Sequence, residues 1–514
     1  MNRLSPTHAI PLLFAAIKIA IHLATVATFG FHRDEFLYLA QGRHPDWGFW
    51  SNPPFTGAMA WCSQQLLGGS LWVTRLPSVL AIGALMWLVL RMVAELGGSA
   101  RAQFLCGLVM LISPAWLRTG TMLQPVPFDI FFWALLSYGL LRWINTRDRR
   151  WWWFIGLVAG IAFLNKYTMV FWAAAMLIAL LVSKERKMLI ARPLWMAVAL
   201  ALLIALPNLL WQWHYHFPVV HHMQDLARYR LQNVQPVNFL LDQLLMNGPG
   251  FVWWLAGLLF LLFSASMRPY RVFAWFYLAL MLIFLILSGK SYYTLGAYPV
   301  LFSAGAVCWE RLLRRPWQQY LLAGAVVANG LLLVPVGIPL YSGQKAVDYY
   351  HWLTYDVGIE GAVRWEDGNL HALPQDFADM LGWDELAELA DRAIETAGDE
   401  PFLLYGDNYG EAGAVEHLSK RLPAGAKAVS FSDTYLLWAP ERIDPAIQTL
   451  IYINDGEAPG KDVQNLFAEI RLIGRIENPL AREHGTGVWL CRQPRGDFAA
   501  FWAERVRQVK AVLR

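Results

Sequence analysis

Two adjacent carboxylates, Asp34 and Glu35, follow the first long apolar segment of this 514-residue chain. Charged groups at the edge of a membrane span are costly to place, so we expect a function for them. Neighbouring carboxylates bind protons more tightly unless cations offset the repulsion, and Arg33 and Arg43 lie in the same stretch. The pattern suits a general base for an acceptor hydroxyl or amine. The structural alternative is a helix N-cap at Asp34, with Glu35 in the first turn.

A second polar group, Lys290-Ser291-Tyr292-Tyr293, follows the ninth predicted apolar span. A cation held at the depth of the lipid headgroups can bind a lipid phosphate, and the serine and the paired tyrosines add hydrogen-bond donors. The structural alternative is that Lys290 only extends its charged end to the membrane surface. This group is therefore our candidate site for the phosphate of a lipid-linked substrate.

Two further candidates are expected near the outer edge of the membrane. Asp129 begins the fourth predicted span, where an acid can help to bind a metal ion, orient an acceptor or cap the following helix. Lys166 lies in a short outer turn between the fifth and sixth spans. Both are interpreted as members of an acceptor or second acidic site.

A later outer loop contains His221, His222 and Asp225. Adjacent histidines rarely bind one ion, and the spacing matches no standard zinc site, so a solvated or lipid-facing loop is the preferred interpretation. Arg228 and Arg230 in that loop are candidates for a phosphate or pyrophosphate. In the first span, the four-residue spacing of Lys18 and His22 places both on one helix face, where a role in transport stays open.

The elements that must position these residues are mostly membrane helices. The chain is 57% hydrophobic and 16% charged, whereas soluble domains carry about 25% charged residues. A span needs about 20 apolar residues. The sequence therefore predicts a polytopic α-helical membrane protein with about eleven spans, at 9–29, 72–94, 101–117, 125–143, 151–165, 168–183, 194–213, 250–266, 271–288, 293–312 and 319–339.

Basic residues occupy every second gap between these spans, and cytoplasmic loops carry such an excess of Lys and Arg. We therefore predict a cytoplasmic amino terminus, with the acidic first loop and the carboxy-terminal domain facing outward, into the periplasm if the protein lies in a bacterial inner membrane. The residues are Arg91 and Arg101; Arg142, Arg147, Arg149 and Arg150; Lys184, Arg186, Lys187 and Arg192; Arg268 and Arg271; and Arg311, Arg314 and Arg315.

Composition divides the chain into a transmembrane domain, residues 1–340, and a soluble outer domain, residues 341–514. The outer domain is predicted to be α/β, with buried strands at 402–405 and 449–453 and helices at 376–396 and 498–512. In the first loop, Pro53-Pro54 is expected to begin a helix at about 55–67 that lies on the membrane surface.

The sequence does not support nucleic-acid binding, a cysteine metal site or a dinucleotide cofactor. The net charge of +4 does not indicate nucleic-acid binding, since most of the basic residues flank membrane spans. The four cysteines show no metal-site spacing. The Gly406–Gly410 run lacks the spaced glycines of a dinucleotide fingerprint, so no such cofactor is predicted.

Three motifs together resemble the family 39-type glycosyltransferases of the GT-C superfamily, which include the protein O-mannosyltransferases and the aminoarabinose transferase that modifies lipid A. They are residues 33–40 (RDEFLYLA), 52–56 (NPPFT) and 290–293 (KSYY) followed by Tyr298-Pro299. Residues 408–414 (NYGEAGA) also resemble a recurrent segment of the outer domain of bacterial members. The resemblance covers most of the chain and is strongest in the first loop.

The resemblance implies a polyprenyl-phosphate sugar donor and transfer to a glycan, lipid or protein acceptor on the outer face of the membrane. It assigns the catalytic base to Asp34, with Glu35 at the neighbouring acidic position, and donor-phosphate contact to Lys290. Arg33, Tyr292 and Tyr293 are expected beside that phosphate. Relatives differ in metal dependence, so a divalent ion on Asp34 and Glu35 stays an alternative, and no other cofactor is expected.

Many relatives carry His where this chain has Asn52, before the double proline, which leaves the acceptor open. Our mechanistic hypothesis is an inverting single displacement. The main alternative is a membrane transporter or lipid-sugar flippase, which predicts charges deep within the spans and an internal repeat. A non-catalytic membrane assembly factor is a third possibility, but it leaves the charged first loop unexplained.

Overall fold

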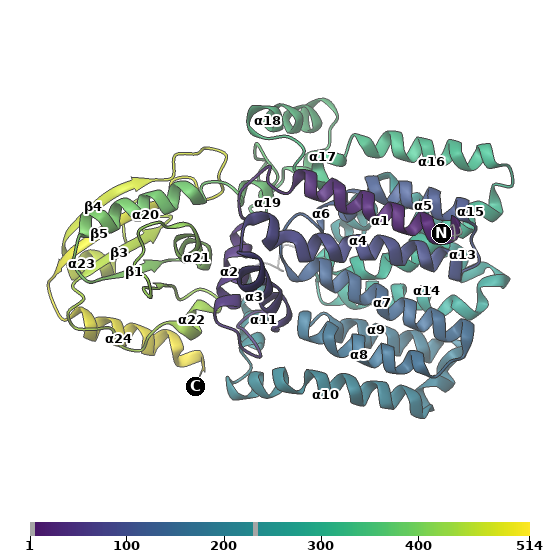
Figure 1. The fold of residues 1–514 in the computed structure, drawn as a ribbon, viewed down its shortest axis with the longest axis horizontal. Coiled ribbons are helices and arrows are strands. Elements are labelled where there is room, and N and C mark those ends of the chain that lie inside the picture. The colour runs from purple at the N-terminus through teal and green to yellow at the C-terminus, as the bar shows by residue number, and fades with distance from the viewer. Residues whose placement is uncertain (1–5, 230–234, 514) are drawn as a thin grey trace.

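The computed structural model describes residues 6–229 and 235–513 as a bundle of long helices that carries a smaller α/β unit at one end (Figure 1). The first helix, α1 (Pro6–Thr25), begins at the end of the bundle that lies farthest from the sheet. The predicted class, a polytopic helical part followed by a carboxy-terminal α/β domain, is confirmed.

Each predicted span falls on helix. By length and composition, four helices of the described residues can cross a membrane, or five if the bent pair α12 (Pro236–Leu245) and η2–α13 (Gly248–Phe263) is one span, so the count of eleven stays a prediction. The bundle helices are α1, α4 (Leu71–Glu95), α5 (Ala100–Ile112), α6 (Pro114–Arg118), α7 (Pro125–Thr146), α8 (Arg150–Asn165), α9 (Met169–Val182), α10 (Arg192–His214), α13 (Phe251–Phe263), α14 (Arg271–Ile286), α15 (Tyr298–Leu312) and α16 (Pro316–Leu331).

The predicted span 293–312 is wrong at its start. Residues Ser291–Ala297 form a 3₁₀ helix, η4, and the α-helix α15 begins only at Tyr298. Proline is favoured in the first turn of a helix, where its missing N–H group would have no intrahelical partner, and Pro299 therefore favours a helix start at Tyr298. The tighter η4 segment carries Tyr292 and Tyr293, two residues of the candidate phosphate site.

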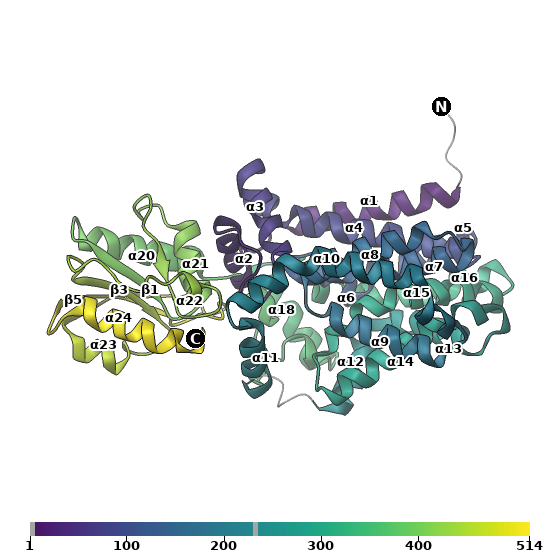
Figure 2. The ribbon, with the colours of Figure 1, turned by 90° about the horizontal axis from the view of Figure 1, so that it is seen from below.

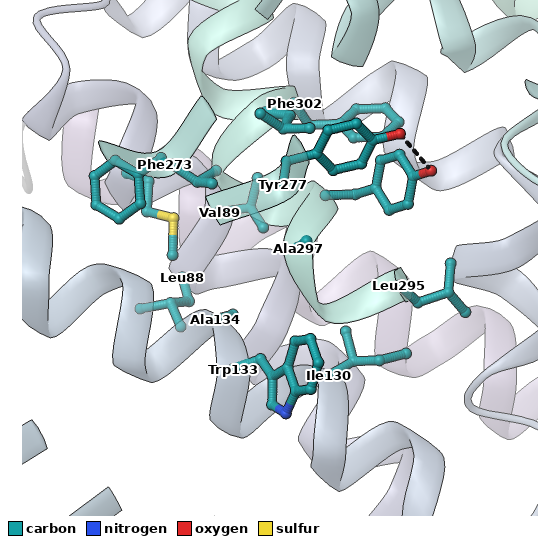
Figure 3. Packing of buried hydrophobic residues seen from close by; sticks show 14 of the residues in the cluster. Leu88, Val89, Ile130, Trp133, Ala134, Phe273, Tyr277, Leu295, Ala297 and Phe302 are labelled. Atoms are coloured by element: carbon teal, nitrogen blue, oxygen red, sulfur yellow. Dashed lines mark hydrogen bonds between the residues drawn. The ribbon is translucent and has the colours of Figure 1, made fainter. Parts of the chain in front are cut away.

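The core of the bundle is built from large apolar side chains of α4, α7, α14 and α15, as Figure 3 shows for Leu88, Val89, Trp133, Phe273, Tyr277 and Phe302. Small residues allow a close helix contact between α13 and α15. A Cβ at Gly257 would collide with the carbonyl oxygen of Leu301, and one at Gly305 with that of Trp253.

The predicted cytoplasmic gaps meet at one end of the bundle, away from the sheet. Contacts between side chains link all five of these gaps, as the predicted alternation requires. The contacts are Arg142 with Glu95, Arg147 with Glu185, Tyr270 with Asn145, Arg311 with Ser266 and Ser99 with Glu310. Which side of the membrane this end faces stays a prediction.

Short helices lie where the bundle meets the α/β unit. They include α2 (Arg33–Arg43), α11 (Pro218–Tyr229) and α3 (Phe55–Leu67), whose bounds match the predicted surface helix. Figure 2 shows α3 and α11 running across the direction of the long helices, on opposite sides of the molecule. Trp61, Leu66 and Leu67 of α3 are exposed, which is the pattern of a helix that lies at a membrane surface.

The outer unit contains a five-stranded sheet of order β2-β1-β3-β5-β4. The strands are β1 (Phe402–Gly406), β2 (Ala428–Val429), β3 (Thr449–Asn454), β4 (Phe467–Arg475) and β5 (Gly487–Pro494); β1, β2 and β3 are parallel, and β5 is antiparallel to both of its neighbours. The two predicted strands are therefore confirmed. Helices α20 (Trp383–Ala397) and α21 (Tyr409–Leu418) pack in one apolar cluster with the sheet, and α24 (Phe498–Val509) packs in another.

The predicted helix 376–396 is wrong as one element. It is divided into α19 (Gln375–Ala378) and α20, because Gly382 adopts φ +88°, a left-handed conformation that ends helical continuity. The predicted helix 498–512 ends earlier, at Val509, in a 3₁₀ turn, η7 (Lys510–Leu513). The remaining short elements are η1 (Lys184–Ile190), η3 (Ala265–Tyr270), α17 (Val334–Gly337), η5 (Trp352–Asp356), η6 (Glu360–Ala362), α22 (Tyr435–Trp438) and α23 (Lys461–Leu466).

The segment between bundle and sheet is not a free linker. It begins with α18 (Gly343–His351), and its buried side chains, such as Leu353 and Phe377, share an apolar cluster with Phe29 and Met122 of the transmembrane part. We call residues 343–381 the strap. The domain boundary at residue 340 stays a prediction, since the strap packs on the bundle.

Candidate active site

The acidic pair occupies the first turn of α2, at the junction of the bundle and the outer domain (Figure 1). His32 caps this helix, because its Nδ1 accepts the Asp34 N–H at 3.1 Å, and the Glu35 carboxylate accepts the His32 N–H at 2.8 Å. The alternative in which Asp34 is the N-cap is therefore wrong. Both carboxylates lie at the positive end of the helix dipole, which favours their ionised forms.

Glu35 is completely buried, at 0% exposure, and its oxygens are fully engaged. Arg75 of α4 donates to both oxygens, with Nη2 at 2.7 Å and Nε at 3.0 Å, and the Leu123 N–H donates at 2.8 Å. Arg75 also donates to the carbonyl oxygens of Val26 and Gly30. These bonds tie α2 to three other parts of the bundle, so Glu35 is a structural anchor in this geometry.

Asp34 has the opposite environment, with 33% of its side chain exposed. Its Oδ1 accepts a 2.6 Å hydrogen bond from the phenol of Tyr409, in the outer domain. Among the described residues, no hydrogen bond reaches Oδ2. Burial tends to raise the pKa of Asp34, but the charges of His32 and Arg33 and the bond from Tyr409 hold it below the usual value. Asp34 is thus an ionised carboxylate with one oxygen open.

Arg33 lies between this carboxylate and the outer domain. Its Nε is 3.8 Å from Asp34 Oδ1, its Nη1 is 3.8 Å from Glu483, and its guanidinium lies 5.5 Å from the centre of the Tyr409 ring. These contacts hold Arg33 at the domain junction. Its predicted contact with a donor phosphate stays a prediction.

The candidate phosphate residues converge with a lysine from another loop. The Nζ of Lys166 lies 5.3 Å from the ring centre of Tyr292 and 5.0 Å from that of Tyr293. Burial lowers the pKa of Lys166, and the nearby charge of Lys290 lowers it further. Two cations and two phenols therefore gather around η4.

This cluster lies within electrostatic range of the acidic helix. Partial desolvation of the Tyr292 side chain, which is exposed at the surface, raises its pKa, and Tyr293, Tyr38 and Asp34 add to the rise. An effect of Asp34 on Tyr292 requires that the two lie within electrostatic range. The structure thus brings Asp34, Lys166, Lys290 and the tyrosine pair to one region.

Lys290 is paired with a carboxylate of the strap. Its Nζ donates to Glu366 at 2.9 Å, and both side chains are partly exposed. The Glu366 N–H in turn donates to the side chain of Gln375. A lipid phosphate at Lys290 would therefore replace a carboxylate that already lies there.

Asp129 and Asn52 have defined partners. Asp129 accepts from the Thr168 hydroxyl at 2.8 Å and lies close enough to Lys166 to act on its charge, whereas Gln124 is the N-cap of α7. Asp129 therefore does not cap that helix. The Asn52 amide exchanges two hydrogen bonds with Gln41, at 2.9 and 3.0 Å, and packs as a buried structural pair.

The acidic pair does not fit a shared metal ion. The oxygens of Glu35 are taken by Arg75 and by backbone N–H groups, so none is left to coordinate a cation beside Asp34. Within residues 6–229 and 235–513, no three His, Cys, Asp or Glu side chains are grouped as metal ligands. We derive no step through a metal.

The remaining candidates from the sequence that the structure describes lie in α11 and α1. The ring of His221 stacks over Trp50 at 6.3 Å, and Arg228 is exposed at the end of α11, while Arg230 falls outside the described residues. His22 lies 2.8 Å from the Leu117 carbonyl oxygen, and its Nδ1 lies 2.9 Å from the carbonyl of Lys18. These residues stay untested as functional groups.

Sequence reasoning missed Arg75, Glu366 and the role of Tyr409. Arg75 had a signal, since it is a lone charge near the start of an apolar span. Tyr409 belongs to the segment 408–414 noted above, but nothing local ties it to Asp34, 375 positions away. Glu366 lies in an ordinary polar stretch and had no signal.

The structure thus brings an ionised carboxylate to within electrostatic range of a cationic, phenol-lined cluster. Comparisons with known proteins find similarity to glycosyltransferases. A family model described as dolichyl-phosphate-mannose-protein mannosyltransferase matches residues 51–211. The lipid A galacturonosyltransferase RgtD of Rhizobium johnstonii is 28% identical over 209 residues, which is 39% of this chain and 42% of the relative. The matched part is thus about two fifths of that relative's length.

Solved structures show the same fold. ArnT from Cupriavidus metallidurans, bound to undecaprenyl phosphate, has a TM-score of 0.63 at 16% identity and covers 93% of this chain and 97% of its own. The arabinofuranosyltransferase AftD from Mycobacteria has a TM-score of 0.50 at 13% identity, covering 94% of this chain and 40% of its own. The chain therefore has the GT-C fold.

Proposed function

We propose that the protein transfers a sugar from a polyprenyl-phosphate donor to an acceptor on the outer face of a bacterial inner membrane. The observation that carries this proposal is the position of Asp34, an ionised carboxylate with one open oxygen, within electrostatic range of the cluster of Lys166, Lys290 and the tyrosine pair. The undecaprenyl phosphate bound by ArnT, whose fold this chain shares, supports a lipid-phosphate donor.

The donor phosphate binds at η4, where Lys166 and Lys290 supply positive charge and Tyr292 and Tyr293 supply hydroxyl donors. Binding replaces the Glu366 carboxylate at Lys290. The prenyl tail lies among the exposed apolar side chains of the bundle helices, in the lipid. This arrangement places the anomeric carbon of the sugar between the phosphate cluster and Asp34.

Asp34 Oδ2 takes a proton from the acceptor hydroxyl or amine, and the acceptor atom bonds to the anomeric carbon. The bond from that carbon to the phosphate oxygen breaks at the same time, and polyprenyl phosphate leaves with the electron pair. The two lysines stabilise the charge that builds on the leaving phosphate. Attack from the side opposite the phosphate inverts the anomeric configuration.

Glu35 takes no part in these steps. It fixes α2 through Arg75, and so fixes the direction in which Asp34 points. The amino terminus and the basic loops lie in the cytoplasm, and the outer domain lies in the periplasm. The bundle supports this topology, since the five basic gaps and the α/β unit occupy opposite ends.

The proposal is tested in membranes that contain equal amounts of the native chain, Asp34→Asn, or the control Asp46→Asn, an exposed acid of the same outer loop. Organic extracts are analysed for polyprenyl-phosphate sugars, and the envelope for glycoconjugates. We expect Asp34→Asn alone to accumulate one lipid-linked sugar and to lose one product. Unchanged profiles in all three would overturn the proposal, and accumulation on the cytoplasmic leaflet only would favour a flippase.

A further inference from the structure

Helix α21 of the outer domain packs unusually close to α2 of the bundle. Its two glycines, Gly410 and Gly413, are three residues apart and share the face that meets α2. A Cβ at Gly410 would collide with the Arg33 side chain, and one at Gly413 would lie 2.7 Å from the Cβ of Phe36. Only glycine permits this approach, and the approach brings Tyr409, at the start of α21, to Asp34.

Asn408 fixes the position of Tyr409. Its side chain caps α21 by accepting the N–H groups of Gly410 and Glu411, at 2.8 and 3.1 Å. The Tyr409 phenol then donates to Asp34 Oδ1 at 2.6 Å, a short bond of the kind that a charged acceptor makes. Burial and the Asp34 charge raise the pKa of Tyr409 well above its usual value, so it remains a donor.

We propose that the outer domain completes the active site: Tyr409 is a positioning residue that holds one oxygen of Asp34 and directs the other toward the acceptor. This inference rests on the proposed function, in which Asp34 is the base. It makes turnover depend on docking of the outer domain, because the bundle alone supplies no donor equivalent to Tyr409 among its described residues.

Tyr409 is not needed to hold the domain in place. Arg43 pairs with Glu416 at 2.9 Å at the other end of α2, and the Gln41 amide donates to the Thr434 hydroxyl at 3.3 Å. Apolar packing of Phe36 and Leu39 with residues of the outer domain adds to these contacts. Loss of one hydroxyl should therefore change the carboxylate and leave the docking intact.

The test compares Tyr409→Phe with Tyr452→Phe. The control removes a phenol of the same domain, which donates to another aspartate, Asp407, at 2.8 Å. The donor is the lipid extract that accumulates in Asp34→Asn membranes, and undecaprenyl phosphate is the binding probe. We expect Tyr409→Phe to lower kcat about tenfold, as loss of a hydrogen bond to a charged group does, with undecaprenyl phosphate binding and Tm unchanged.

Native kcat in Tyr409→Phe, or an equal loss in Tyr452→Phe, would overturn the inference. Weaker undecaprenyl phosphate binding with native kcat would also overturn it, because it would assign Tyr409 to the donor. If Tyr409→Phe lowers Tm, a double-mutant cycle with Asp34→Asn decides. If the two side chains are coupled, the double variant loses less stability than the sum of the losses in the two single variants, whereas additive losses would overturn the inference. A fully active Asp34→Asn would instead refute the proposed function itself.

Discussion

The two faces of helix α2 carry adjacent carboxylates with opposite tasks. On the inward face, Glu35 is buried and accepts five hydrogen bonds, one from the N-cap of its own helix and four from Arg75 and Leu123, with Arg75 as its ion-pair partner. On the outward face, Asp34 is one-third exposed, and its side chain has a single hydrogen-bond donor within the described part of the chain, from another domain. The comparison teaches that a saturated carboxylate orients a helix, and it is the reason why the proposed function assigns the chemistry to the neighbour whose lone pairs remain open.

The largest expected effect on activity belongs to the outward face. Asp34→Asn removes the base and keeps the shape of the side chain, so turnover should fall by about 10²- to 10⁴-fold, the usual contribution of general base catalysis. The measurement is product formation in membranes at matched expression. A loss of less than about tenfold would remove Asp34 from the centre of the mechanism.

The largest expected effect on stability belongs to the inward face. Arg75→Met leaves the buried Glu35 carboxylate without its ion-pair partner, which should cost about 3–5 kcal/mol of the free energy of unfolding. The control is Arg91→Met, near the far end of the same helix, α4, where a substitution outside the core should change stability by about 0.5 kcal/mol or less. Equal melting curves in detergent for the two variants would contradict the anchor role of Glu35.

A smaller effect is expected at the phosphate cluster. Lys290→Met should weaken undecaprenyl phosphate binding about tenfold, the value of one charge-assisted hydrogen bond. Glu366→Gln should strengthen it by two- to fivefold, because the exposed ion pair that the phosphate must replace is weak. Binding is measured by titration in detergent. Weaker binding in Glu366→Gln would mean that the strap assists the donor instead of competing with it.

The smallest expected effect concerns pH. His32, Arg33 and Tyr409 hold the pKa of Asp34 below its usual value. The ionised base is therefore fully present above the ordinary carboxyl range, and is lost only as pH falls through the lowered pKa. Turnover should not decline between pH 7 and pH 5 through titration of Asp34. A decline over that interval in the native chain that is absent when Tyr409 is replaced would contradict this assignment.

The sequence predicted elements that depend on local patterns. The apolar runs located the bundle helices, the double proline located α3, and the acidic pair located the first turn of α2. It also located Lys290 and the tyrosine pair, because a polar group directly after a span is conspicuous. The break at Gly382 was missed because the surrounding residues all favour helix and only the left-handed backbone ends it.

The sequence could not predict which distant side chains contact the candidate site residues. Glu35 and Asp34 look equivalent until Arg75, 40 positions away, and Tyr409, 375 positions away, are placed beside them. Lys166 was assigned to the acceptor side, yet helix packing brings it to the tyrosines of η4. Such pairs follow from the tertiary fold, and no periodicity in a single chain encodes them.

The central claim is the division of labour between the two carboxylates, and one paired measurement tests it directly. Asp34→Asn and Glu35→Gln are compared for thermal stability and for turnover of the accumulated lipid-linked sugar. Asp34→Asn should melt like the native chain and have almost no turnover, while Glu35→Gln should melt much earlier and keep most of its turnover per folded molecule. The reverse pattern, with Glu35→Gln stable but inactive and Asp34→Asn active, would contradict the account.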